Sequence, residues 1–280
     1  TDASREIIIS YDDPRIILVE NEVNLGLSKS LNKGIRRARG KYIARQDADD
    51  ASHLNRLEKE LAAVQRENYD VVFCRYQYTT KRGKRLPWVS PMISAQSLGK
   101  ELIELKDPVA HGSVLMKKES LIDAGGYDEM FVFSQDYELW MRLLSSNKKF
   151  KCVDYVGYYQ RLLPYVDKIK RDAQQRYTAI VTDYYVNDKE MLSSEFPELD
   201  DTLVSSGRPK QRSRMSALRH FSYWLKIQNI RSRAFYESFL VNSRYPQHLR
   251  NQGIKVLMVT GVYHPEVSGA ANQCRQLMNA

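Results

Sequence analysis

Segments with the residue pattern of β-strands alternate with helical segments along the first part of the chain. Leu27, Leu31 and Ile35 share one stripe of a helix, whereas RIILVE at residues 15–20 is a short apolar run typical of a buried strand. The pattern predicts helices at residues 3–11, 28–38 and 54–64, and strands at residues 15–20, 41–44 and 70–78. Such alternation is typical of an α/β fold in which helices cover both faces of a mostly parallel sheet.

The alternation becomes less regular beyond a turn at residues 81–84. The sequence predicts helices at 97–105, 119–124, 137–144 and 166–186, an extended segment at 111–116 and a strand at 150–159. Gly125 and Gly126 follow the second of these helices, where two glycines are expected to end it with positive φ angles.

Three carboxylates crowd the end of the strand predicted at residues 41–44. Asp47, Asp49 and Asp50 lie within the segment KYIARQDADD. Half-buried carboxylates repel one another, so this cluster is favourable where a divalent cation neutralises it. Oxygen ligands suit Mg²⁺ or Mn²⁺, and such an ion keeps positions open for phosphate oxygens. The cluster therefore predicts a metal site for a nucleotide-diphosphate substrate.

The acidic cluster has two other interpretations. It could be a solvated turn in which Ser52 caps the following helix. It could also be a calcium loop, with Glu58 at the twelfth position from Asp47. The calcium loop fails because Ala51 offers no side-chain oxygen and Ser52 replaces the glycine that such a loop requires.

Composition indicates a soluble chain that stays in a reducing compartment. The three cysteines, Cys74, Cys152 and Cys274, are far apart and form no metal-ligand or disulfide pattern, so the cytoplasm is the expected location. No apolar run approaches the roughly 20 residues of a membrane span, and the chain does not start with a signal-peptide pattern.

The positive charge of the chain is concentrated in one segment. Residues 202–252 carry ten Lys and Arg residues and one Glu, which gives +9, equal to the formal net charge of the whole chain. No nucleic-acid recognition motif is present, so no nucleic-acid partner is expected. Leu218, Phe221 and Leu225 form an apolar stripe in this segment. It could contact an anionic membrane surface as a basic amphipathic helix, or it could pack on a neighbouring domain.

Residues 254–280 change character again. IKVLMVTGVYHPEVSGAANQCRQLM reads as an apolar strand, a loop with Gly261, Pro265 and Gly269, and the start of a helix. This is the pattern that opens a nucleotide-binding α/β unit. One strand and one helix cannot bury that strand, so the unit is expected either to dock on the preceding domain or to continue in a longer polypeptide.

Three blocks together resemble the family 2 glycosyltransferases, which have the GT-A fold. The blocks are NLGLSKSLNKGIRRARGKYIARQDADD, HGSVLMKKESLIDAGGYDEMF and SQDYELWMRL. The resemblance implies that Asp47 and Asp49 form the metal-binding motif, with Asp50 beside them. It implies that Asp136 is the catalytic base. Gln135 stands where these enzymes often have Glu.

The same resemblance implies an inverting transfer from a nucleotide-diphosphate sugar to a glycan or lipid-linked hydroxyl acceptor. On the donor side, it implies roles for Asn24, Gly26, Lys29, Asn32 and Asp47. On the acceptor side, it implies roles for His111, Gly126, Tyr127 and Trp140. Structural roles compete for several of these positions: Asp136 could be a helix cap, Lys29 could face solvent and His111 could be a satisfied buried residue.

The chain departs from the family at its start. Family members begin with strands that hold the nucleotide base. The resemblance starts after that point, at TDAS, so the first strands are expected to be missing and donor binding to be weak. The end of the chain resembles the start of a GT-B glycosyltransferase of family 4. We therefore expect a truncated catalytic domain at 1–200, a basic helical linker at 201–252 and the beginning of a second unit at 253–280.

Two alternatives to a complete transferase remain from the sequence. A nucleotidyltransferase would also use a metal, but its glycine-rich phosphate loop is not visible. An incomplete transferase could act as a binding or scaffold module at a membrane or in a multi-enzyme assembly. For the transferase, polysaccharide synthesis on the cytosolic face of a membrane is the expectation. The residues do not specify the sugar, the acceptor or the oligomeric state.

Overall fold

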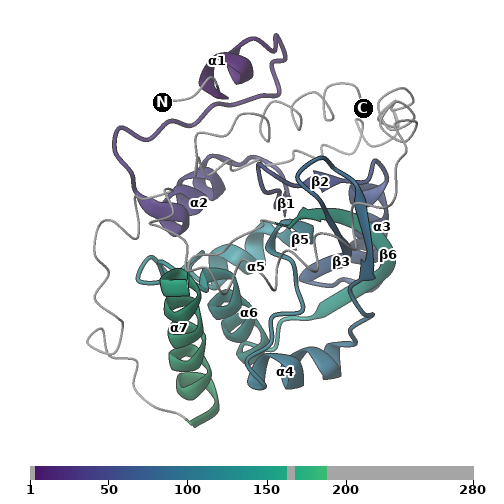
Figure 1. The fold of residues 1–280 in the computed structure, drawn as a ribbon, viewed down its shortest axis with the longest axis vertical. Helices are drawn as coiled ribbons and strands as arrows, with labels where there is room; N and C mark the ends of the chain where they lie inside the picture. Colours follow the sequence, from purple (N-terminus) through teal and green to yellow (C-terminus); the bar gives the residue numbers. More distant parts are fainter. Residues whose placement is uncertain (1–3, 163–167, 188–280) are drawn as a thin grey trace, which may run out of the picture.

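The computed structural model describes residues 4–162 and 168–187. This part of the chain forms a six-stranded sheet in the order β1-β5-β3-β6-β2, with β4 paired to β3 off that path. The strands are β1 (Tyr42–Ala44), β2 (Ala51–Ser52), β3 (Val71–Thr79), β4 (Arg85–Val89), β5 (Val114–Lys117) and β6 (Phe150–Arg161). Figure 1 shows the curled sheet with helices on both sides.

The helices follow the predicted order closely. They are α1 (Ser4–Ile9), α2 (Gly26–Arg37), α3 (Arg56–Glu67), α4 (Ala95–Ile103), α5 (Lys118–Asp123), α6 (Gln135–Ser145) and α7 (Lys168–Asn187), with a 3₁₀ turn η1 (His111–Ser113) before β5. Gly125 and Gly126 follow α5 with φ angles of 85° and 76°, as the sequence predicts for a helix stop. The predicted α/β class and the flanking helices are confirmed.

The strand directions differ from the mostly parallel sheet that was predicted. Of the pairings in the described region, only β3 with β6 is parallel, and β5 runs antiparallel to both β1 and β3. The strand–helix–strand pattern correctly predicts that β1, β3 and β6 run in the same direction. β1 and β3 are both antiparallel to β5, and β6 is parallel to β3. It could not show that β5 inserts between β1 and β3, or that a tight turn folds β4 back on β3.

The two faces of the sheet are covered by different helices. Val71 and Phe73 in β3 point into the larger core, which contains buried residues of α2, α4, α5, α6 and α7. Val72 lies between them in sequence and packs on the opposite face against Leu57, Leu61 and Val64 of α3. This alternation follows from the two-residue period of a strand. Figure 1 shows α6 and α7 on one side of the sheet and α3 on the other.

Several expectations are corrected or fall outside the described residues. The strand predicted at residues 15–20 is not formed: the segment has no ladder partner in the described region, and Ile17 is 50% exposed. His111–Ser113 is a 3₁₀ turn rather than part of an extended segment. The predicted linker at 201–252 and the second unit at 253–280 lie outside the described residues.

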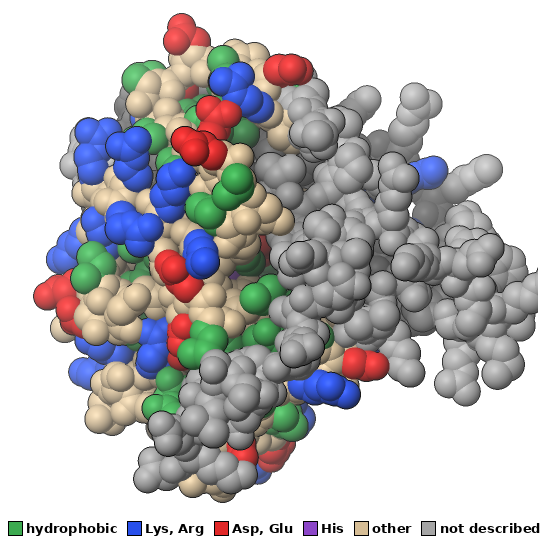
Figure 2. All heavy atoms as spheres, turned by 90° about the vertical axis from the view of Figure 1, so that its left-hand side faces the viewer, with side chains coloured by type: hydrophobic (Ala, Val, Ile, Leu, Met, Phe, Trp, Pro, Cys, Tyr) green, Lys and Arg blue, Asp and Glu red, His purple; other side chains and the backbone are tan. Residues whose placement is uncertain are grey.

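The surface gives no sign of a membrane-crossing element in this region. None of the described helices is both long enough and apolar enough to span a bilayer. Figure 2 shows the left-hand side of Figure 1, where charged side chains of both signs surround small groups of hydrophobic ones.

A buried arginine, Arg56, connects α3 to residues 45–52 and to the η1 turn. Arg56 is 2% exposed, and its Nη1 donates to the carbonyl oxygen of Gly112 at 2.5 Å and to Ser52 Oγ at 2.9 Å. Its Nη2 donates to the carbonyl oxygen of Arg45 at 2.9 Å. Glu60, one helical turn later and fully buried, lies 3.4 Å from Arg56 Nε. Burial raises the pKa of Glu60 to about 7, against the lowering effect of the Arg56 charge.

Replacing Arg56 with Met should destabilise the fold strongly, because Glu60 would stay buried without its cation and four hydrogen-bond acceptors would lose their donor. We expect the free energy of unfolding to fall by about 3–5 kcal/mol, the range for breaking a buried ion pair. Urea denaturation monitored by circular dichroism measures this change. Arg66→Met is the control, since Arg66 pairs with Glu67 on the exposed surface of the same helix and should have little effect. Equal stability of the two variants would contradict the role assigned to Arg56.

Candidate active site

The acidic segment forms a loop between β1 and β2, where Arg45 and Asp47 make an ion pair. Arg45 Nη2 lies 2.6 Å from Asp47 Oδ1, and the Arg45 side chain is only 4% exposed. Two further nitrogens of Arg45, Nε and Nη1, are buried without a hydrogen-bond partner among the described residues. Burial alone would raise the pKa of Asp47, but the Arg45 charge and hydrogen bonds from Arg45 and Tyr158 hold it below its usual value. Asp47 is therefore ionised at neutral pH.

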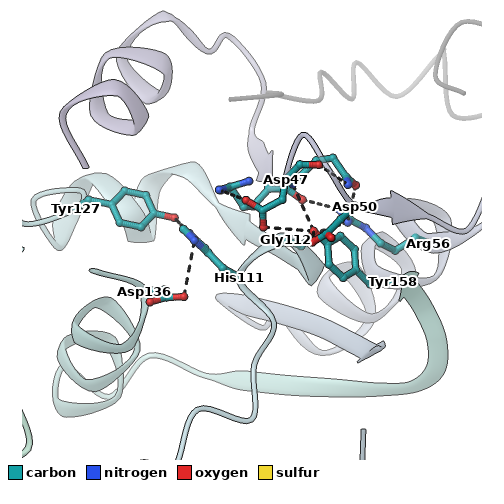
Figure 3. Close-up of polar contacts among 10 residues, drawn as sticks. Asp47, Asp50, Arg56, His111, Gly112, Tyr127, Asp136 and Tyr158 are labelled. Atoms are coloured by element: carbon teal, nitrogen blue, oxygen red, sulfur yellow. Dashed lines mark hydrogen bonds and ion pairs between the residues drawn. The ribbon is translucent and has the colours of Figure 1, made fainter. Parts of the chain in front are cut away.

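Asp50 turns inward from the same loop and is held on both of its oxygens. Its Oδ2 accepts a hydrogen bond from the Tyr158 hydroxyl at 2.7 Å, and its Oδ1 accepts one from the Arg161 amide at 2.7 Å. Burial and the negative charge of Asp47 raise the pKa of Asp50 to about 7. Asp50 thus fastens the loop to β6 (Figure 3).

The three carboxylates of the loop do not converge on one point. Within residues 4–162 and 168–187, no group of three or more His, Cys, Asp and Glu side chains is arranged to hold a metal ion. The three-carboxylate site predicted from the sequence is therefore not formed here, because the hydrogen bonds from Tyr158 and Arg161 turn Asp50 away.

Asp47 and Asp49 nevertheless fit a divalent ion that is completed by a ligand. The Asp49 side chain is partly exposed, and its pKa is raised by burial and by the negative charge of Asp47. A cation beside the two carboxylates would relieve that repulsion. Mg²⁺ is commonly held by one or two carboxylates together with water and substrate phosphates, so a third protein carboxylate is not required.

Tyr158 connects the acidic loop to the η1 turn through a very close approach. A Cβ atom on Gly112 would lie 1.7 Å from the Tyr158 hydroxyl oxygen, so any larger residue at this position would displace the ring. The same hydroxyl donates to Asp50 and, at 3.3 Å, to Asp47 Oδ2. Figure 3 shows Gly112 directly against this network. Gly112 is therefore needed for the geometry of the carboxylates.

His111 lies between the acidic loop and a second group of polar side chains. Its Nε2 is 2.7 Å from the Tyr127 hydroxyl, and its Nδ1 is 3.8 Å from Asp136 Oδ2. Burial and the nearby charge of Arg45 lower the pKa of His111 to about 4, so the imidazole is neutral at neutral pH. The structure thus brings together His111 and Tyr127 from one sequence block and Asp136 from the next, as the resemblance implied (Figure 3).

Asp136 lies at the start of α6 beside a pocket of about 270 Å³. Its Oδ1 accepts a hydrogen bond from the amide of Tyr137 at 3.0 Å, which agrees in part with the capping role considered from the sequence. The side chain stays 23% exposed. Most groups around the pocket are polar; the lining residues are Leu105, Asp107, Ser134, Gln135, Asp136, Tyr137, Gln174 and Thr178. A small polar ligand can therefore reach Asp136.

Asn32 holds the turn that carries Gly126 and Tyr127. Its Nδ2 donates to the carbonyl oxygen of Tyr127 at 2.8 Å, and its Oδ1 accepts from the Tyr127 amide at 2.8 Å. Asn32 is 7% exposed, so the predicted contact with a donor is replaced by a structural role. A side chain on Gly126 would meet Asn32 Oδ1 at 2.6 Å, which explains the glycine there.

The remaining predicted donor residues lie at the start of α2. Asn24 Oδ1 accepts from the amide of Gly26 at 3.0 Å, and Gly26 has a φ of 76°. Lys29 is exposed, so the solvent-facing interpretation is open to it as well as a donor contact. The donor-side roles of Asn24, Gly26 and Lys29 stay predictions.

The structure corrects the acceptor-side role predicted for Trp140. Trp140 is fully buried and its ring packs edge-on against His111 at 6.1 Å, so it supports His111 from within the core instead of facing an acceptor. Arg56, Tyr158 and Gln46 were not anticipated as site residues. Gln46 accepts from Arg56 Nη1 at 3.3 Å and from Ser52 Oγ. The adjacency of Gln46 to Asp47 was the only signal in the sequence.

Comparisons with known proteins agree with this geometry. Residues 1–125 match the model of the family described as glycosyl transferase family 2. The chain is 33% identical over 154 residues to an uncharacterized glycosyltransferase, MJ1057, of Methanocaldococcus jannaschii, covering 54% of this chain and 53% of that protein. It is 29% identical over 162 residues to the amylovoran biosynthesis glycosyltransferase AmsE of Erwinia amylovora, covering 50% and 58%. The chain thus spans about half the length of these relatives.

A solved structure shows the same fold. TarS of S. aureus, residues 1–349, in complex with UDP-GlcNAc, superposes with a TM-score of 0.52 and 16% sequence identity, covering 90% of this chain and 66% of that one. At this identity the likeness establishes the GT-A-like arrangement of sheet and helices and nothing about ligands.

Gly112→Ala should lower the stability of the fold, because the added methyl group displaces the Tyr158 ring. We expect the free energy of unfolding to fall by about 1–3 kcal/mol, as for other overpacked interiors. Gly99→Ala is the matched control, because a Cβ at Gly99 in α4 meets nothing within 4 Å. That change should stabilise the helix by about 0.5–1 kcal/mol. Chemical denaturation of both variants measures the difference, and a stabilised Gly112→Ala would refute the close contact.

Proposed function

We propose that the protein is a glycosyltransferase that moves a sugar from a nucleotide-diphosphate sugar to a hydroxyl acceptor, and the match of residues 1–125 to the model of glycosyl transferase family 2 supports this proposal. The observation that carries this proposal is the position of His111 between the acidic loop and Asp136. On one side of His111 lies a carboxylate pair suited to a cation and a diphosphate. On the other side lies the partly exposed carboxylate of Asp136, beside a polar pocket.

Asp136 is the proposed general base. The acceptor hydroxyl gives its proton to the Asp136 carboxylate while its oxygen forms a bond to the anomeric carbon of the donor. The bond from that carbon to the diphosphate oxygen breaks, and its electron pair leaves with the diphosphate. A single displacement of this kind inverts the configuration at the anomeric carbon.

His111 and Tyr127 are proposed to fix this part of the site. Because the His111 imidazole is neutral, it places no full positive charge beside Asp136, and that carboxylate remains free to take a proton. The hydrogen bond to Tyr127 fixes the ring orientation at its other nitrogen. Trp140 packs edge-on against the His111 ring from the core.

Asp49, with help from Asp47, is proposed to hold Mg²⁺ or Mn²⁺. When bound, such an ion neutralises the negative charge that grows on the diphosphate as it leaves. The protein's own part is to keep Asp47 ionised through Arg45 and to keep Asp50 turned away through Tyr158. This arrangement would leave the carboxylates of Asp47 and Asp49 to hold the cation.

The chemical class of donor and acceptor follows from the relatives as a proposal. The complex of TarS with UDP-GlcNAc supports a nucleotide sugar as donor. AmsE, an amylovoran biosynthesis glycosyltransferase, supports a polysaccharide acceptor. Work on such an acceptor at the cytoplasmic face of a membrane, with residues 201–252 contacting anionic lipid, remains a prediction outside the described residues.

Asp136→Asn should abolish transfer and leave donor binding unchanged, because the amide cannot take the acceptor proton. We expect turnover, measured as UDP release from a panel of UDP-sugars with polysaccharide acceptors, to fall by about 10²–10⁴-fold. Asp123→Asn, at an exposed position in α5, is the control and should keep full turnover. Undiminished turnover in Asp136→Asn would remove Asp136 from the proposed role. Binding of UDP with no turnover in the parent chain would favour the binding-module alternative.

Asp49→Asn should weaken the binding of Mn²⁺ in the presence of UDP, since one of two carboxylate ligands is lost. Isothermal titration of Mn²⁺ into the UDP-loaded protein should show at least about a tenfold loss of affinity, in the range seen when a site loses charged ligands. Asp13→Asn, which removes a surface ion pair with Arg15, should leave Mn²⁺ affinity unchanged. Equal Mn²⁺ affinities in all three proteins would exclude the acidic loop as the cation site.

A further inference from the structure

An aromatic cluster lies on the β3–β4 hairpin, outside the candidate active site. Tyr78 and Trp88 are stacked, with ring centroids 5.3 Å apart and an angle of 26° between the rings. Tyr76 meets both rings edge-on, each at a centroid distance of 5.6 Å. Tyr76 is 8% exposed, whereas Trp88 is 47% exposed. The cluster therefore has a buried base and an open top.

The hairpin holds these rings in fixed positions. The Tyr76 amide donates to Ser90 Oγ at 2.8 Å, and the Ser90 amide donates to the carbonyl oxygen of Tyr76 at 2.8 Å. Gln77 Nε2 donates to the carbonyl oxygen of Leu86 at 2.7 Å, which ties the two strands on the other side of Trp88. An aromatic surface that is held in place loses little conformational entropy when a ligand covers it.

The cluster is joined to the candidate active site by two connections. Tyr76 packs in one buried group with Ala110, next to His111, and with Tyr158, which holds Asp50. Asp107 provides the second connection, because it lines the pocket beside Asp136. Asp107 is three residues before Ala110, which packs against Tyr76 at the base of the cluster.

We propose that the open face of Trp88, backed by the stacked ring of Tyr78, is a distal subsite for the acceptor, where it binds a pyranose ring of an extended glycan chain whose growing end lies at Asp136. The chain passes Asp107 between the two points. This inference deepens the proposed function, on which it rests, by making the acceptor an oligosaccharide or polysaccharide of equatorially linked sugars.

Carbohydrate chemistry matches both parts of this surface. A pyranose ring with equatorial substituents has flat faces of C–H groups, which cover an aromatic ring and remove apolar surface from water. Its hydroxyl groups lie around the edge, where the carboxylate of Asp107 and the amides of Gln135 and Gln174 can bond to them. The Tyr78 ring covers one face of the Trp88 ring, so the exposed Trp88 offers its other face to a flat, equatorially linked sugar.

Glycan binding by the full chain tests the proposal. The probes are cellohexaose and chitohexaose, with glucose and N-acetylglucosamine as the matching monomers, titrated calorimetrically. At least one hexamer should bind about tenfold or more tightly than its monomer, and Trp88→Ala should lose about tenfold in affinity for it. Trp88→Phe should retain most of that affinity. Tyr184→Ala, which removes another exposed aromatic residue in α7, should bind as the parent does.

Two results would overturn the subsite: neither hexamer binding better than its monomer, or Trp88→Ala binding the preferred hexamer as tightly as the parent. UDP affinity measured on the same proteins separates this inference from the proposed function. Hexamer binding that depends on Trp88 in a protein that does not bind UDP would support the subsite and count against the transferase. UDP binding and turnover with hexamer affinity independent of Trp88 would do the reverse.

Discussion

The buried guanidinium of Arg56 is the interaction on which the arrangement of the site depends. It reaches from α3 to the carbonyl oxygen of Arg45 at the start of the acidic loop, to Ser52 and Gln46 within that region, and to the carbonyl oxygen of Gly112 in η1. These segments come from different parts of the chain. A charged group buried at this point costs free energy unless it is well paired. The hydrogen bonds and Glu60 offset that cost, and in doing so they hold the acidic loop and the η1 turn at a fixed separation.

From this anchor, each side chain of the site is positioned by its neighbour. Gly112 leaves room for the Tyr158 hydroxyl, which keeps Asp50 turned inward. Asp47 and Asp49 remain partly exposed. His111, next to Gly112, is then aligned between Tyr127 and Asp136. The two halves of the proposed chemistry, charge neutralisation on the diphosphate and proton removal from the acceptor, are thus linked through two consecutive residues. A small change at η1 would disturb both.

The parts of this structure that depend on local sequence were predictable, and those that depend on long-range packing were not. The stripe of Leu31 and Ile35 in α2 and the stop at Gly125 and Gly126 follow from helix periodicity and glycine conformations. The hydrogen bond from Tyr158 to Asp50 joins residues 108 positions apart, so no spacing in the sequence could show that Asp50 is a support and not a metal ligand. The insertion of β5 between β1 and β3 is likewise a matter of strand adjacency, which alternation of strands and helices does not specify.

The central claim is that the open side of the acidic loop holds a divalent cation and a diphosphate, opposite Asp136. A crystal of the chain soaked with Mn²⁺ and UDP, with data collected at the manganese absorption edge, tests it most directly. The account predicts one anomalous peak within ligand distance of the Asp49 carboxylate and of diphosphate oxygens, with Asp50 still bonded to Tyr158. A bound UDP with no anomalous peak at Asp49, or a peak coordinated by Asp50 in place of Asp49, would contradict it.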